Sequence, residues 1–244
     1  MTAIMLRPAR LVRLLAGDAL NVARDPMLLL ATGMSLLPAL ALHLAQPAMD
    51  GAALAAFGIV QLSRYLVPLA LLIPAVLIGW VTGFLLLEDR DEGTLLALDV
   101  TPVGKAGFLA YRALVTAALA LAVTLYAWPL ILPALPALVV LGLAALVALN
   151  AVAIAVILPT LARNKVEGLA LTKLLNLLSV APLLAAIPSP LRLLGGVLPS
   201  YWVGEMLGLA AVAPLPAGLA FGLGLAVGGL ELAGLFHLLG RRAG

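Results

Sequence analysis

Residues 113–162 form an unbroken run without a single charged side chain, which is difficult to place inside a soluble domain. Three further uncharged runs, 65–87, 174–191 and 206–230, are each near the roughly 20 residues that a helix needs to cross a bilayer. A helix in a soluble core needs only one apolar face, whereas these runs are apolar on every side. Only 10% of the residues are charged, against about 25% in an ordinary soluble domain. The sequence therefore predicts an all-α integral membrane protein.

The apolar runs and the prolines between them predict six spanning helices in one transmembrane domain, residues 26–239. We expect spans at 26–44, 65–87 and 169–187, two more within 113–162, and the last at 216–239. Asp50 is expected in an outer loop, and 188–214 in a longer external segment. Tryptophan favours the interface and proline breaks helices, so the turn between the third and fourth spans is expected at Trp128, Pro129, Pro133 and Pro136. Residues 240–244 are expected to form a short tail.

The first 25 residues predict a helix lying on the membrane surface. Over residues 4–24 one helical face carries apolar side chains and another carries arginines that suit anionic headgroups. The alternative is a solvated basic leader that only orients the first span. We expect no cleavable signal peptide, because the first apolar run begins only after Asp25, behind four arginines.

The basic residues are distributed unequally between the two sides of this predicted topology. With the N-terminus inside, the outer side holds only Arg64 and Arg192 of the 14 lysines and arginines. Lysine and arginine concentrate on the cytoplasmic side of membrane proteins. We therefore expect both ends in the cytoplasm and the protein in a bacterial-type cytoplasmic membrane. The basic excess is explained by topology, so no nucleic-acid partner is expected.

Motifs for catalysis and for cofactor binding are absent from the sequence. There is no cysteine, and His43 and His237 fall on opposite sides of the predicted membrane, so no metal site is expected. The phosphate-binding loop is missing, because Gly104-Lys105 is followed by Ala106 rather than by serine or threonine. We expect a chain that is not an enzyme, has no catalytic residue and binds no cofactor itself.

The most informative hydrophilic segment is 88–105, which follows the second span. A dense charge run begins it, Gly93-Thr94 permits a turn, and leucines then precede Thr101-Pro102. A short helix with exposed leucines and an acidic leading edge suits docking into a groove of a partner protein. The alternative is a solvated loop whose leucines rest on lipid headgroups.

The run EDRDEGTLLALDVTP (88–102) resembles the first cytoplasmic loop of type-2 permeases of ATP-binding-cassette exporters. The six-span topology and the Pro199-x-Tyr201-Trp202 segment before the last span are similar to the same family, and the compact size is similar to its drug-export permeases. The resemblance implies a coupling helix that contacts a separate ATPase subunit, which would hold ATP and magnesium. It also implies a dimer with a second copy or a paralogue. The residues expected to couple to the ATPase are Glu88, Glu92, Gly93, Thr94, Leu95, Leu98, Thr101 and Pro102.

Three polar residues inside the predicted spans are candidates for a translocation pathway. Glu231 lies about 15 Å along the helix from Arg241, and a carboxylate at that depth is costly and by default functional. Asn150 and Asn176 are weaker candidates, since asparagine often joins helices instead. A buried, protonated Glu231 bonded to a neighbouring helix is the alternative.

Glycines spaced four residues apart predict close helix packing. They are Gly79 with Gly83 on the second span, and Gly218 with Gly222 and Gly224 with Gly228 on the sixth.

The function expected from these features is ATP-driven export of a small lipophilic compound by a permease subunit. Two other functions stay open at this point. An ion-gradient-driven secondary transporter would use Glu231 as its proton site and need no ATPase. A membrane scaffold or assembly factor would bind a soluble partner through 88–105 and show no transport.

Replacing Leu95 by arginine is predicted to abolish association with the ATPase subunit while leaving the fold intact. Loss of an apolar anchor at an interface costs about 2 kcal/mol or more, roughly a thirtyfold loss of affinity. Leu95→Met, of similar size, should bind normally. A pull-down paired with a melting curve in detergent measures both properties. Unfolding of Leu95→Arg would make the leucine structural, and normal binding would place the coupling site elsewhere.

Overall fold

The computed structural model of the protein describes residues 16–242, apart from 18, 21, 25 and 94–103. The described residues form helices and no strand, which confirms the all-α prediction. In chain order the elements are α2 (Pro26–Met34), α3 (Leu37–Phe57), α4 (Ser63–Asp91), α6 (Gly104–Ile131), α7 (Ala137–Leu161), α8 (Lys165–Leu175), the 3₁₀ helices η1 (Asn176–Ser179), η2 (Ala181–Ala186) and η3 (Pro190–Val197), α9 (Tyr201–Met206) and α10 (Ala217–Arg242).

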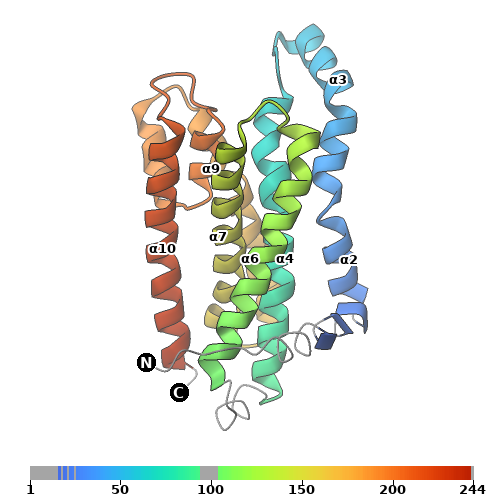
Figure 1. Ribbon diagram of the computed structural model, residues 1–244, viewed down its shortest axis with the longest axis vertical. Coiled ribbons are helices and arrows are strands. Elements are labelled where there is room, and N and C mark those ends of the chain that lie inside the picture. Colours follow the sequence, from blue (N-terminus) through green and yellow to red (C-terminus); the bar gives the residue numbers. More distant parts are fainter. Residues whose placement is uncertain (1–15, 18, 21, 25, 94–103, 243–244) are drawn as a thin grey trace.

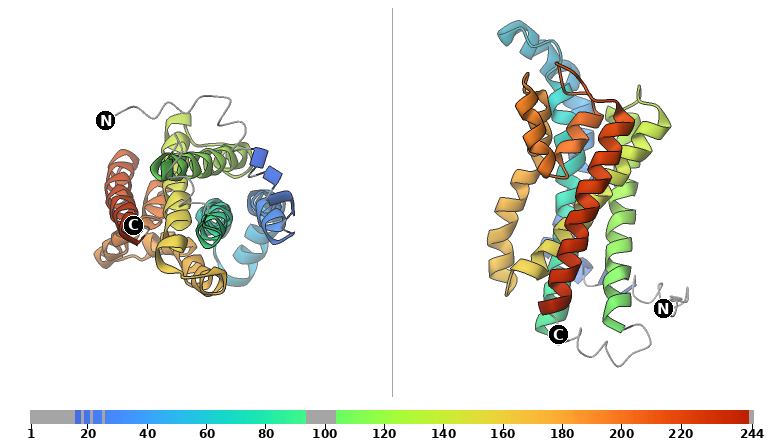
Figure 2. Two further views of the ribbon diagram at one scale, coloured as in Figure 1. Left: turned by 90° about the horizontal axis from the view of Figure 1, so that it is seen from below. Right: turned by 90° about the vertical axis from the view of Figure 1, so that its left-hand side faces the viewer.

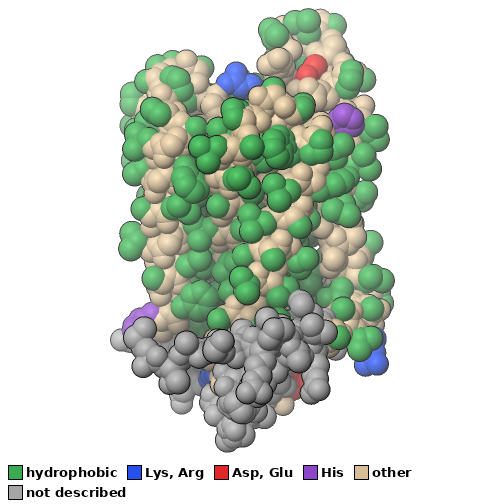
Figure 3. Space-filling view, viewed as in Figure 1, with side chains coloured by type: hydrophobic (Ala, Val, Ile, Leu, Met, Phe, Trp, Pro, Cys, Tyr) green, Lys and Arg blue, Asp and Glu red, His purple; other side chains and the backbone are tan. Residues whose placement is uncertain are grey.

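Six helical segments of the described chain are long and apolar enough to cross a bilayer, which confirms the predicted number of spans. They lie side by side, with the start of α2, the end of α4, the start of α6 and the end of α10 at one end of the bundle, here termed the α4–α6 end (Figure 1). Above the residues drawn in grey, hydrophobic side chains are spread over the flank of the bundle, as contact with lipid tails requires (Figure 3).

Helices α4 and α7 form the centre of the bundle. Within an apolar 18-residue stretch of each, 78% is buried inside the molecule, whereas only 17% of such a stretch of α10 is. Helix α7 packs against α4, α6 and α10, and α3 packs against α4 (Figure 2). Because α7 is surrounded by other helices, every side of it is apolar, and its buried face extends over the whole circumference.

The α4–α7 contact depends on small residues. A Cβ atom added at Gly79 would lie 2.4 Å from the Ala151 carbonyl oxygen, and one at Gly83 would lie 2.5 Å from Leu158 Cδ1 and 3.2 Å from the Ala155 carbonyl oxygen. Close packing at the Gly79–Gly83 pair is therefore confirmed. Lipid tails are as apolar as leucine, so van der Waals packing of this kind is what holds such helices together.

The first span is longer than predicted and is broken. Helix α2 ends at Met34, because Pro38 has no N–H to donate to the Met34 carbonyl. Helix α3 then continues to Phe57, well beyond the predicted end at residue 44. The prediction that Asp50 lies in a loop was wrong. Asp50 lies within α3, and its carboxylate accepts hydrogen bonds from the backbone N–H (2.8 Å) and hydroxyl (2.7 Å) of Ser63 at the start of α4.

Two other helix ends also differ from the predictions. The charge run was expected to lie in the loop 88–105, but α4 continues through Asp91, because a helix that leaves the bilayer need not stop at its surface. Trp128 and Pro129 were expected in the turn between spans three and four, whereas both lie in α6, which ends at Ile131. The turn between α6 and α7 spans 132–136 and contains Pro133 and Pro136.

The fifth span changes helix type part-way. It is α-helical from Lys165 to Leu175 and then continues as the 3₁₀ helices η1 and η2. Helix α9 of the predicted external segment packs against η2, α7 and α10, with Tyr201 and Val203 fully buried. A Cβ atom added at Gly204 would lie 2.2 Å from the Pro182 carbonyl oxygen, so the backbones of α9 and η2 touch. The external segment is therefore part of the packed bundle.

Two further predictions concern the first residues of the chain and the glycines of the sixth span. Of the predicted surface helix, 4–24, the residues that the structure describes (16, 17, 19, 20 and 22–24) are helical. The rest of that helix, with Arg7, Arg10 and Arg13, lies outside the described residues.

The four glycines predicted to pack on the sixth span divide into two pairs. Gly224 and Gly228 meet α7 and α9, while nothing in the described chain lies within 4 Å of a Cβ added at Gly218 or Gly222.

Gly79→Ala is predicted to lower the stability of the solubilised protein, because the new methyl group collides with the α7 backbone. Overpacking of this kind typically costs about 1–3 kcal/mol. Gly51→Ala in α3 is the matched control, since nothing described lies within 4 Å of its added Cβ. It should be neutral or slightly stabilising. Thermal unfolding of both variants in one detergent measures the difference, and equal melting temperatures would contradict the assigned α4–α7 contact.

Candidate functional site

The end of α4 carries charged side chains that contact three other helices. Glu88 Oε1 accepts a hydrogen bond from Lys165 Nζ at 2.8 Å, which joins α4 to the first residue of α8. Both side chains are partly exposed, by 37% for Glu88 and 46% for Lys165, so solvent screens the pair and its contribution to stability is small. Its geometry nevertheless positions the start of the fifth span beside the end of the second.

A second ion pair at this end is much less exposed. Arg112 Nη2 donates to Asp89 Oδ2 at 2.8 Å, and the two side chains are 5% and 16% exposed. The guanidinium carbon also lies 5.0 Å from the centre of the Phe108 ring, within the range of a cation–π contact. This pair joins α4 to α6 on the two sides of residues 94–103.

Arg90 joins α4 to the end of α7. Its Nη1 donates to the carbonyl oxygens of Pro159 (2.9 Å) and Ala162 (3.1 Å), and its Nη2 donates to that of Arg163 (2.8 Å). The last carbonyls of a helix have no partner within the helix, and a cation there also interacts favourably with the helix dipole. The charged end of α4 is thus bonded to α6, α7 and α8.

Glu92 and Gly93 lie at the end of α4. Glu92 is exposed, and its N–H donates to the Glu88 carbonyl oxygen at 2.9 Å. Gly93 has φ +73°, a left-handed conformation that residues with a Cβ atom rarely adopt, and it turns the chain out of the helix. Of the other predicted coupling residues, Glu88 lies in α4. Thr94, Leu95, Leu98, Thr101 and Pro102 lie outside the described residues.

The three predicted pathway residues lie on different elements. The Asn150 side-chain amide donates to the Leu146 carbonyl oxygen at 2.8 Å within α7. Asn176 is exposed at the junction of α8 and η1. Glu231 is half-buried on α10, and its Oε2 has no hydrogen-bond partner among the described residues. Among the described hydrogen bonds, none joins two of the three, and their role in transport stays a prediction.

At the opposite end of the bundle a buried ion pair lies under the external segment. Arg192 Nε donates to Glu205 Oε1 at 2.9 Å, and the residues are only 4% and 1% exposed. The Tyr201 hydroxyl donates to the same carboxylate oxygen, and Arg192 Nη2 donates to the Ala213 carbonyl oxygen at 2.7 Å. Burial, and next the Glu205 carboxylate, raise the pKa of Tyr201 above its ordinary value, so the hydroxyl stays protonated and remains a donor. The network holds η3, α9 and the chain before α10 together.

Sequence reasoning missed both buried pairs. It counted Arg192 only among the outer basic residues and Arg112 among the inner ones. The signal for Asp89–Arg112 was available, because the two residues lie at similar depths on consecutive spans and have opposite charges. For Glu205, the signal was its spacing four residues after Tyr201, which places both on one helical face.

Comparison with known proteins identifies one family. The model of the fluoroquinolones export permease proteins described as Rv2686c-like matches residues 18–236, nearly the whole transmembrane bundle. The chain belongs to this family. It is an integral, multi-pass membrane protein of a drug-export permease family, in agreement with the resemblance drawn from residues 88–102. No curated protein and no solved structure matches the chain.

Glu205→Gln is predicted to destabilise the permease, because it leaves the Arg192 guanidinium buried without a counter-charge. Breaking a buried pair in this way costs about 3–5 kcal/mol, whereas replacing both partners by apolar residues is often neutral. The double variant Arg192→Met/Glu205→Leu should therefore melt at a higher temperature than Glu205→Gln. Glu92→Gln, at an exposed position, is the control. If Glu205→Gln melted at the same temperature as that control, the network would not hold the external segment.

Proposed function

We propose that this chain is the permease subunit of an ATP-driven exporter of the ATP-binding-cassette type. It moves a small lipophilic drug outward across the cytoplasmic membrane together with a separate ATPase subunit and a second permease copy or paralogue. Both ends of the chain, and with them the α4–α6 end of the bundle, face the cytoplasm. Fluoroquinolones, named in the description of its family, are the proposed drug class.

The observation that carries this proposal is the set of bonds at the end of α4. The run 88–102, which begins in α4 and continues past Gly93, resembles the first cytoplasmic loop of type-2 permeases. Four residues before Gly93, Asp89 bonds to α6, and its neighbours Arg90 and Glu88 bond to α7 and α8. A displacement of 94–103 by a partner is therefore transmitted to three further helices at once. A solvated loop has no need of such connections.

The packing indicates which helices move together in this proposed coupling. Helix α4 also forms the seam with α7 through Gly79 and Gly83, so a rigid movement of α4 carries the central pair of the bundle. Close-packed helices move as units and do not bend gradually. The ATPase supplies the free energy, and this chain supplies the pathway and the linkage.

Transport into inside-out membrane vesicles tests the proposal. With a co-expressed ATPase subunit, uptake of a fluoroquinolone should require ATP, continue when a protonophore collapses the ion gradient, and stop when the ATPase carries an inactive phosphate loop. Uptake that depends on the gradient and continues with the inactive ATPase would instead establish a secondary transporter. An absence of uptake under every condition, with the ATPase still bound, would favour a scaffold. Vesicles with the ATPase subunit alone provide the background.

A further inference from the structure

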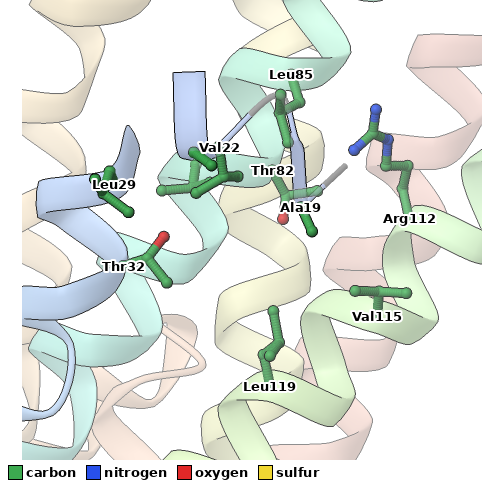
Figure 4. Close-up of a pocket in the computed structure, with 11 residues that line it drawn as sticks. Ala19, Val22, Leu29, Thr32, Thr82, Leu85, Arg112, Val115 and Leu119 are labelled. Atoms are coloured by element: carbon green, nitrogen blue, oxygen red, sulfur yellow. The ribbon is translucent and has the colours of Figure 1, made fainter. Parts of the chain in front are cut away.

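A cavity of about 340 Å³ lies between α2, α4 and α6, beside the described part of the N-terminal helical segment (Figure 4). Cavities of this size accommodate drug-sized ligands. Figure 4 shows Leu29 and Thr32 on one side, with Arg112, Val115 and Leu119 following one another along the facing side of α6. The remaining lining residues are Ala19, Val22, Ala23, Val81, Thr82 and Leu85.

The side chains around the cavity are largely apolar, as on a surface that faces lipid tails. Helices α2 and α6 each pack on α4, and apolar side chains at the rim face outward, with Leu29 54% and Leu119 46% exposed. Arg112 lies eight residues after Gly104, or about 12 Å along α6, so the cavity lies in the half of the bilayer nearest the α4–α6 end. A compound dissolved in that leaflet would enter the cavity by lateral movement within the membrane.

The lining is apolar except for Arg112 and Thr82 at one end and Thr32 on the α2 side. Arg112 is the one charged side chain among the eleven lining residues that the structure describes. Its guanidinium is held by the Asp89 carboxylate and by the Phe108 ring, which fixes its plane. A guanidinium presents five N–H donors in a rigid fork that matches a carboxylate. Beside it, the Thr82 hydroxyl lies 2.8 Å from that of Thr116.

We propose that this cavity binds an amphiphilic compound bearing a carboxylate, taken up from the adjacent leaflet. The carboxylate lies on the Arg112 guanidinium, and the flat apolar body lies against Val115, Leu119 and Leu29. This inference rests on the proposed export function and gives the place where its substrate binds. It also gives a link to the coupling segment, because a ligand carboxylate competes with Asp89 for Arg112 and so weakens the bond between α6 and the end of α4.

Binding to the purified permease in lipid nanodiscs tests the site without the ATPase. The probes are a fluoroquinolone with its free carboxylate and the methyl ester of the same compound. Because a charge-assisted hydrogen bond strengthens binding by about tenfold or more, the acid should bind at least that much more tightly than the ester. Equal affinities, or no binding of the acid, would overturn the proposal.

Two variants locate the bound compound. Val115→Trp fills the cavity and should weaken binding of the acid by about tenfold or more. Leu114→Trp is the matched control, because Leu114 is the preceding residue on α6, is 61% exposed and does not line the cavity. It should bind the acid within about twofold of the unmodified chain. Equal binding by both tryptophan variants would place the compound elsewhere.

A variant at the charged end tests the role of the carboxylate. Arg112→Gln should bind acid and ester equally, whereas an unchanged preference for the acid would overturn the assignment. Since Arg112→Gln strands Asp89, the double variant Asp89→Asn/Arg112→Gln, which keeps two polar partners without charge, repeats the comparison in a neutral setting. Failure here is distinct from failure of the export function. Normal ATP-dependent transport by Val115→Trp would overturn the site alone, and binding to the site without ATP-dependent transport would overturn the function alone.

Discussion

Close approach of two helices, α4 and α7, underlies the arrangement of the whole bundle. Lipid supplies no hydrophobic force between helices, so association depends on how many atoms come into contact. Gly79 and Gly83 allow the α4 backbone to touch that of α7 near Ala151 and Ala155, and the flanking side chains then interdigitate. The outer helices pack around this pair. Because the two backbones come into contact along this seam, we expect α4 and α7 to move as one body.

The charged residues add connections where the apolar seam ends. Asp89, Arg90 and Glu88 attach the end of α4 to α6, α7 and α8, and Arg192 with Glu205 closes the opposite end of the bundle. Both groups contain one strongly buried pair, whose partners are expensive to separate in a low-dielectric setting. Movement of the apolar middle against lipid tails costs little free energy. Movement at the two ends requires defined hydrogen bonds to break and new ones to form.

The number and type of the spans could be predicted from the sequence, because the absence of charge over 113–162 leaves a membrane helix as the remaining solution. Helix ends were harder to predict, since a charge marks the membrane surface but does not stop a helix. Asp50 and Glu88 both lie inside helices for this reason. The Asp89–Arg112 pair depends on how α4 and α6 are rotated about their axes, and the charge pattern alone does not determine those rotations. The role of Leu95 and its neighbours stays a prediction.

The 3₁₀ part of the fifth span has a mechanical consequence. A 3₁₀ helix rises about 2.0 Å per residue and an α-helix about 1.5 Å, so the ten residues of η1 and η2, four and six respectively, form a segment about 5 Å longer than the same residues would in an α-helix. An α-helix over the same residues would leave the Leu178 carbonyl without a donor, because Pro182 has no N–H, so the 3₁₀ form suits this sequence. Since α9 rests on η2, this extra length sets how far the outer segment stands from the Lys165 end of α8.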